Sequence, residues 1–164
     1  MSNKFAYFAG GCFWCVTPLF KIQDGVIDVR SGYSGGDEPN PSYEEVKSQK
    51  TGHRETIKIE YDETKISYEF LLRGFLDGVD IHDGEGQYID RGHSYTLAVY
   101  YDTDEEKAII DRVLSEYDEE IFVSVERFKF FCEAEEYHQD YYLKHPKEFE
   151  EELINSGRKQ SKLK

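Results

Sequence analysis

Residues 56–61 read TIKIEY, an alternation of apolar and polar side chains that is typical of a half-buried β-strand. Ile57, Ile59 and Tyr61 fall on one face of such a strand. Lys58 and Glu60 fall on the other, because successive side chains of a strand point to opposite sides. The stretch therefore predicts a sheet with one face against a core, and the flanking segments supply the other strands.

Strand patterns and helix patterns alternate on both sides of this stretch. The other predicted strands are KFAYF (4–8), GVIDVRSGY (25–33), YTLAVYY (95–101) and IFVSVER (121–127). A helical pattern over residues 13–23 follows the first strand. Ser67 can cap a second helix, which Gly78 ends. Thr103 and Glu106 form a capping box that opens a third helix with one apolar face.

The first six main elements run β-α-β-β-α-β, the ferredoxin-like order of a sheet with helices packed on one face. We therefore predict an α+β chain, a two-layer α/β sandwich with a ferredoxin-like core. An extra C-terminal strand and helices over about 134–144 and 147–155 follow this core. Neither a repeat nor a Ser/Gly linker divides the sequence, so one domain is predicted over residues 1–157, with a frayed basic tail over 158–164.

The composition excludes several classes of partner. The 164 residues include 20 Lys and Arg against 34 Asp and Glu, and the net charge of −14 argues against nucleic acid and anionic membrane surfaces. No stretch approaches the roughly 18 apolar residues that a membrane span needs. Self-repulsion of this charge favours a monomer. Three cysteines, an odd number without a signal-peptide core, are typical of a reducing compartment, so we predict a cytoplasmic protein.

The sharpest chemical feature is FAGGCFWC at residues 8–15. Cys12 stands where a strand ends at two glycines and a helix begins, and a helix N-terminus stabilises a thiolate. Phe13 and Trp14 are apolar and suit a small hydrophobic pocket beside that thiol. Cys15 completes a Cys-x-x-Cys spacing, which can form a disulfide or contribute two of the four ligands of a zinc site.

Beyond this motif, the sequence resembles the A-type peptide methionine sulfoxide reductases. Gly11-Cys12-Phe13-Trp14 is similar to the signature of that family. Three further segments match in the same order, which are GYSGGDEPNPSYEEV (32–46), TGHRE (51–55) and AEEYHQDYY (134–142). The resemblance implies an α/β sandwich related to the ferredoxin-like fold. It also implies an enzyme of oxidative-damage repair that reduces the S-epimer of methionine sulfoxide, free or in proteins, without an organic cofactor or metal.

The resemblance assigns roles to individual residues. Cys12 would attack the sulfoxide sulfur, release methionine and become a sulfenic acid. Glu55 matches the acid of the family, which must stay protonated before attack. Tyr43 and Tyr95 match two tyrosines that hydrogen-bond the sulfoxide oxygen, and Asp90 matches an acidic residue that orients the substrate or a water. The implied pocket for the substrate is lined by Phe13 and Trp14, with Tyr137 and His138.

The sequence departs from the family pattern at four places. Thr17 replaces a glutamate that is not the catalytic acid, and Lys47 replaces a cysteine. The loop around Asp90 reads EGQYIDRGHSY where the family has GNDxGxQYRS, so Asp90 matches by its place and not by its neighbours. No cysteine follows Cys132, whereas many members carry recycling cysteines in a C-terminal tail.

The thiol that resolves the sulfenic acid therefore stays open between Cys15, Cys132 and an external thiol such as thioredoxin. Three other functions also stay open. A thiol-disulfide oxidoreductase would use Cys-x-x-Cys alone. A zinc-binding interaction module would use Cys12, Cys15, Cys132 and His138. A reductase-like protein could also bind oxidised methionine without turnover.

Overall fold

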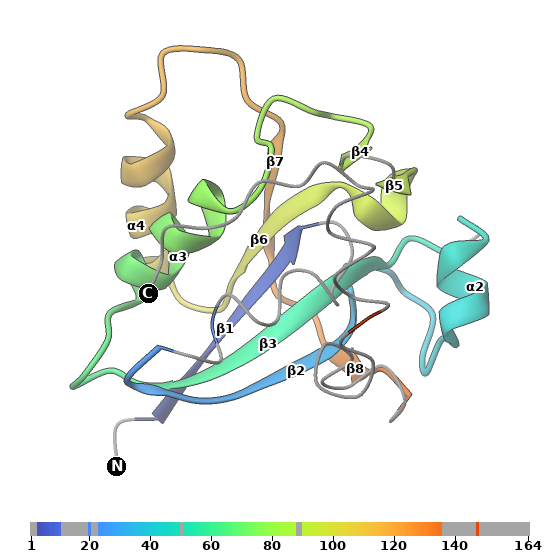
Figure 1. Cartoon of the computed structure of the whole chain (residues 1–164), viewed down its shortest axis with the longest axis horizontal. Helices are drawn as coiled ribbons and strands as arrows, with labels where there is room; N and C mark the ends of the chain where they lie inside the picture. The colour runs from blue at the N-terminus through green and yellow to red at the C-terminus, as the bar shows by residue number, and fades with distance from the viewer. Residues whose placement is uncertain are drawn as a thin grey trace.

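A six-stranded sheet forms the centre of the protein (Figure 1). The computed structural model describes residues 3–10, 20, 23–49, 51–87, 90–135 and 147. The spatial order of the strands is β7-β6-β1-β3-β2-β8, and every neighbouring pair is antiparallel except β6 with β7. The strands are β1 (Asn3–Gly10), β2 (Val26–Ser34), β3 (Arg54–Asp62), β6 (Leu97–Tyr101), β7 (Val123–Arg127) and β8 (Phe131–Glu133).

Among the described helices, α3 and α4 lie against one face of the sheet, and the short helix α2 stands apart from them in the connection between β2 and β3 (Figure 1). Helix α3 packs on β1 and helix α4 on β6, and the two helices contact each other. The smaller elements lie in the loops that join the strands. The bounds are α2 (Tyr43–Lys47), α3 (Tyr68–Asp77), β4 (Gly86–Gln87), β5 (Asp90–Arg91), the 3₁₀ helix η1 (His93–Tyr95) and α4 (Asp104–Leu114). The prediction of a mixed α/β chain is confirmed at this level.

The core lies between the sheet and α3 and α4. The predicted inner face of β3 is buried, with Ile57, Ile59 and Tyr61 each at most 2% exposed. Phe8 of β1 stacks on Phe75 of α3 with ring centroids 4.9 Å apart. Burying a side chain of this size contributes about 1.5–3 kcal/mol, so the alternation of the strands supplies the driving force for the layered arrangement.

The helix caps follow the sequence with one difference. Ser67 accepts a hydrogen bond from the Phe70 N–H, and the helix ends at Gly78, as predicted. Thr103 accepts from the Glu106 N–H, but the Glu106 carboxylate accepts from the Asp102 N–H, one residue before the cap. The Glu106 side chain therefore bonds the Asp102 amide instead of the Thr103 amide, and it still satisfies a backbone N–H at the start of the helix.

Several predicted boundaries were wrong. Strand β1 continues through Gly10 instead of breaking there, and Gly10 serves close packing, since a Cβ on it would lie 2.5 Å from the Phe75 ring. Tyr95 belongs to η1, so β6 starts at Leu97. Strand β7 starts at Val123 and not at residue 121.

The chain between β7 and β8 crosses the face of the sheet that the helices leave uncovered. Phe128 stacks on Tyr7 at 3.9 Å, and the Ser34 hydroxyl donates to the Phe130 carbonyl at 2.6 Å. Strand β8 then pairs with β2 at the opposite edge from β7. This strand was not predicted, because three residues are too few for a periodic pattern and the pairing partner is about 100 residues away.

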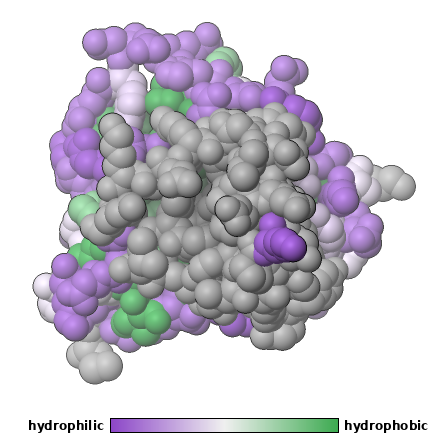
Figure 2. All heavy atoms as spheres, in the orientation of Figure 1, coloured by the Kyte–Doolittle hydropathy of each residue, from purple (hydrophilic) through white to green (hydrophobic). Residues whose placement is uncertain are grey.

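The described part of the surface is mostly hydrophilic. Among the coloured residues of Figure 2, hydrophilic side chains predominate over apolar ones. The large exposed apolar side chains come from β1, β2, α3 and the loop between α4 and β7, and these are Phe5, Ile27, Phe70, Tyr117 and Phe122. No helix within the described ranges is long and apolar enough to span a membrane.

Candidate active site

Three side chains form a row across β3, β2 and β8 at one end of the sheet. Tyr33 of β2 is the register partner of Glu55 on β3 and of Cys132 on β8. Register partners in antiparallel strands point to the same face, and in β3 that face also carries Ile57. With about 4.8 Å between strands, Cys132 lies roughly 10 Å from Glu55 along this Glu55–Tyr33–Cys132 row.

Glu55 and Tyr33 are removed from water. Glu55 is 2% exposed and Tyr33 is fully buried. Glu55 stands one residue inside β3, whose neighbours on both sides are strands, so its backbone is fixed by the sheet. A carboxyl group in such surroundings is a candidate proton donor, because burial disfavours the charged form. The sequence prediction placed Glu55 at the start of a strand, and the structure adds the burial.

Tyr43 and Tyr95 stand on two short elements that one glutamine joins. The Gln49 amide donates from Nε2 to the Ser94 hydroxyl at 2.8 Å and accepts at Oε1 from the Ser94 N–H at 3.0 Å. Gln49 follows α2, which starts at Tyr43, and Ser94 precedes Tyr95 in η1. The two short elements that carry the predicted oxygen-binding tyrosines are thereby joined, and Tyr95 is buried.

Asp90 lies in the small hairpin between α3 and η1. Its backbone pairs with Gln87. The Gln87 amide is hydrogen-bonded to the backbone of Asp80 in both directions, at 2.8 Å each. Arg91 and Asp83 form a further ion pair across the loop at 2.6 Å. Hydrogen bonds and an ion pair therefore hold the described parts of this altered loop, and the role of Asp90 stays a prediction.

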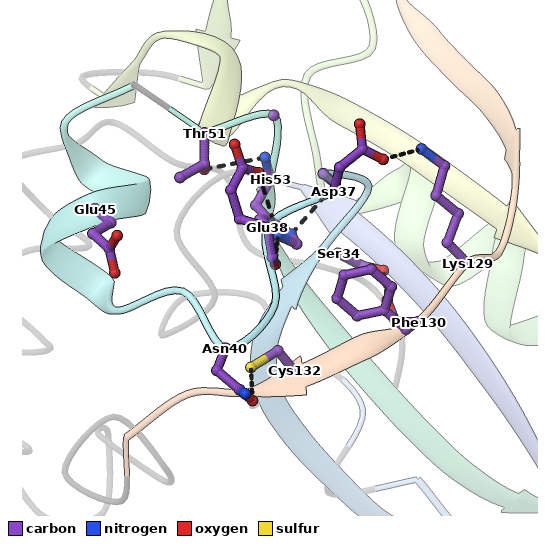
Figure 3. Close-up of polar contacts among 12 residues, drawn as sticks. Ser34, Asp37, Glu38, Asn40, Glu45, Thr51, His53, Lys129, Phe130 and Cys132 are labelled. Carbon is purple, nitrogen blue, oxygen red and sulfur yellow. Dashed lines mark hydrogen bonds and ion pairs between the residues drawn. The ribbon is translucent and has the colours of Figure 1, made fainter.

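His53 is a buried structural residue that the sequence reasoning missed. Its ring accepts at Nδ1 from the Gly36 N–H at 3.3 Å, so Nε2 carries the proton that goes to the Glu38 carbonyl at 2.8 Å. Figure 3 shows His53 against the loop after β2, with the Phe130 ring beside it. Gly36 is required there, since a Cβ would lie 2.7 Å from the His53 backbone nitrogen. The His of the TGHRE segment thus holds the loop that leads to Tyr43.

Cys132 lies at the outer edge of the row, with its sulfur facing Asn40 (Figure 3). The Sγ to Asn40 Oδ1 distance is 3.8 Å. Burial raises the pKa of the Cys132 thiol, Asn40 opposes that shift, and Glu135 and Glu133 add to it. The thiolate is the nucleophilic form of cysteine, so Cys132 is poorly activated in this state.

The remaining predicted site residues lie outside the described residues. These are Cys12, Phe13, Trp14, Cys15, Tyr137 and His138. The predicted helix over 13–23 and the predicted C-terminal helices also lie largely outside the described residues. Ala134 and Glu135, which were predicted to begin the helix over about 134–144, are described and are not helical.

Ala9, three residues before Cys12, pairs with Thr56, one residue after Glu55. The chain therefore leaves β1 beside Glu55. Within the described ranges, no group of three His, Cys, Asp or Glu side chains is placed to hold a metal ion.

A polar cluster lies on the opposite face of β3, directly behind Glu55. The Arg54 guanidinium donates to Glu126 at 2.8 Å and to the Thr96 hydroxyl at 2.8 Å. It also donates to the buried Tyr100 hydroxyl at 3.3 Å. Thr96 follows Tyr95, so Arg54 ties the strand of Glu55 to the segment of Tyr95.

Replacing Arg54 with methionine is expected to lower the free energy of unfolding by about 1–3 kcal/mol, because it removes a charged donor from the buried Tyr100 hydroxyl and from Glu126, which keeps only the Ser124 hydroxyl. Urea unfolding would measure the loss. Lys107→Met is the matched control, since Lys107 pairs with Asp111 at the exposed surface and such pairs contribute less than about 1 kcal/mol. Equal losses in the two variants would contradict the interpretation.

Comparisons with known proteins agree on one family. The sequence profile described as peptide methionine sulfoxide reductase matches residues 4–164. A Bacillus licheniformis protein named peptide methionine sulfoxide reductase MsrA is 41% identical over 162 residues, which cover 95% of this chain and 90% of that protein. The reduced form of Mxr1 from Saccharomyces cerevisiae is similar in structure, with a TM-score of 0.80 and 27% identity over 89% of this chain and 87% of that one. A structure of Mxr1 in complex with Trx2 is similar with a TM-score of 0.54 and 20% identity over 85% of each chain.

Proposed function

The chain belongs to the peptide methionine sulfoxide reductase family and reduces methionine sulfoxide, and we propose that Cys12 and Glu55 carry this reaction on the S-epimer, free or in proteins. The observation that carries the assignment of Glu55 is its burial in the sheet next to the point where the chain leaves β1 toward Cys12. Cys12 is assigned by the match of its motif.

The reaction is a transfer of oxygen from sulfur to sulfur. The Cys12 thiolate attacks the sulfoxide sulfur, the sulfoxide oxygen passes to Cys12, and methionine leaves, so that Cys12 ends as a sulfenic acid. Negative charge develops on the sulfoxide oxygen during the attack and must be neutralised. Glu55 supplies the proton, and Tyr43 and Tyr95 donate hydrogen bonds to the same oxygen.

The other site residues complete the proposal. Phe13 and Trp14 form the pocket for the substrate methyl group, and Tyr137 and His138 contribute to its lining. Asp90 orients the substrate or a water from its hairpin, as the match of its position supports. None of these steps requires an organic cofactor or a metal, since the oxygen acceptor is the cysteine itself.

The sulfenic acid is then returned to a thiol. A second thiol condenses with it to a disulfide and water, and an external dithiol such as thioredoxin reduces that disulfide by exchange. The Mxr1 complex with Trx2 is a precedent in a protein of the same fold. We propose Cys15 as the second thiol, because its spacing from Cys12 is one helical turn and because burial raises the pKa of Cys132.

A single-turnover assay tests both the reaction and the resolving thiol. Fully reduced protein is mixed with methionine S-sulfoxide without added reductant, and methionine formed and thiols lost are counted together. The wild type and Cys132→Ser are expected to form one methionine and lose two thiols, whereas Cys15→Ser loses one.

Other outcomes of this assay are informative. If Cys132→Ser lost one thiol and Cys15→Ser lost two, Cys132 would be the resolving residue. One thiol lost in every protein would indicate direct reduction by an external thiol. No methionine in the wild type would overturn the proposed function.

We also propose that the core is ferredoxin-like and that residues 1–157 form one catalytic domain with a frayed tail. The order β6-β1-β3-β2 supports this topology, and so does α3, which follows β3 and precedes β6 in the chain. A monomer is favoured by the net charge of −14. A cytoplasmic location fits an enzyme that must keep its cysteine reduced.

A further inference from the structure

We infer that Glu135 is a positioning residue that anchors Tyr43 to the Glu55–Tyr33–Cys132 row, an inference that rests on the proposed function. Its carboxylate bridges two elements that are distant in the sequence. The Tyr33 hydroxyl donates to Oε1 at 3.1 Å, and the Tyr43 N–H donates to Oε2 at 3.1 Å. One side chain thus contacts both the wall beside the proposed acid and the backbone of a proposed oxygen-binding tyrosine.

Helix α2 depends on such an anchor because of its length. It has five residues, far below the length at which a helix is stable on its own. Ser42 and Glu45 form a capping box that satisfies each other's amide. The Tyr43 N–H, in the first turn, has no partner inside a helix and takes the Glu135 carboxylate instead. A negative group at this end also suits the helix dipole.

The other end of the bridge is rigid. Tyr33 is fully buried and held in β2 between β3 and β8. Its ring stands in the row between Glu55 and Cys132, so its hydroxyl is a fixed point of the sheet. Glu135 therefore holds α2 in a set position relative to β2 and β3, the strand pair that also holds Glu55.

This geometry matters for the reaction because two donors must reach one oxygen. Glu55 gives a proton to the sulfoxide oxygen while Tyr43 donates a hydrogen bond to it. A displacement of about 1 Å in such an arrangement can cost up to about 100-fold in rate. Since the charge on the oxygen develops in the transition state, the loss should fall on kcat more than on KM.

The first test compares two variants of Glu135 by methionine formation. Glu135→Ala is expected to lower kcat by about 10- to 100-fold. Glu135→Gln is expected to keep most of the activity, because the amide oxygen can accept from the Tyr43 N–H while the amide nitrogen donates to the Tyr33 oxygen. Glu133→Ala is the matched control and should be as active as wild type, since Glu133 pairs with Arg30 at the surface, at 3.1 Å.

The second test separates positioning from general stability. In a Tyr43→Phe background, Glu135→Ala should cost less than about threefold further, because the hydroxyl that it positions is already gone. A full additional loss there, or a Glu135→Gln variant as slow as Glu135→Ala, would overturn the inference while the proposed function stands. A wild type without methionine formation would instead overturn the proposed function, and this inference with it.

Discussion

Cys12→Ser is expected to abolish methionine formation from methionine S-sulfoxide. The hydroxyl of serine stays protonated at neutral pH and cannot accept the sulfoxide oxygen as a sulfenic acid, so no first turnover can occur. Methionine is measured by chromatography, with excess dithiol so that recycling does not limit the rate. Cys12→Ser should form no methionine even in a single turnover, whereas Cys15→Ser and Cys132→Ser should each form one.

Cys132→Ser serves as the control for this variant. It removes a thiol from the same protein and is expected to keep full activity with excess dithiol. Cys132 lies at the edge of the Glu55–Tyr33–Cys132 row and not beside the end of β1, from which the chain continues to Cys12. Turnover by Cys12→Ser comparable to the wild type would contradict the assignment of the nucleophile.

Glu55→Gln should slow methionine formation by something like 10²- to 10⁴-fold, the range typical of general acid catalysis. Glutamine has nearly the same shape and keeps hydrogen-bonding capacity, but it cannot supply the proton. The buried position makes the loss difficult to replace by water, since Glu55 is 2% exposed. Single-turnover rates of methionine release would measure this effect apart from recycling.

Glu60→Gln is the matched control, because Glu60 lies on the same strand but on its opposite face, where it accepts a hydrogen bond from Asn3 at 3.0 Å. Its rate should equal that of the wild type. If Glu55→Gln turned over as fast, another group would have to be the proton donor.

Local patterns were sufficient for much of the fold. The alternation of residues 56–61 and the capping residues Ser67 and Thr103 depend on neighbours in the sequence, so their structures could be predicted. Strand β8 and the 3₁₀ helix at Tyr95 could not, because each is stabilised by partners far along the chain. The bounds of β1 were also missed, since Gly10 meets the ring of Phe75 only after α3 has packed.

The sequence by itself determined the family and the candidate catalytic residues, because matching motifs carry the residue types that the chemistry needs. Only the tertiary structure decided which residues support them. His53, Arg54 and Glu135 each act through contacts with residues 15 to 102 positions away. Hydrogen bonds and strand pairing do not depend on how far apart two residues are in the sequence. They form wherever packing brings a donor to an acceptor. For that reason, the burial of Glu55 and the bridge from Tyr33 to Tyr43 appear in the fold and not in the motifs.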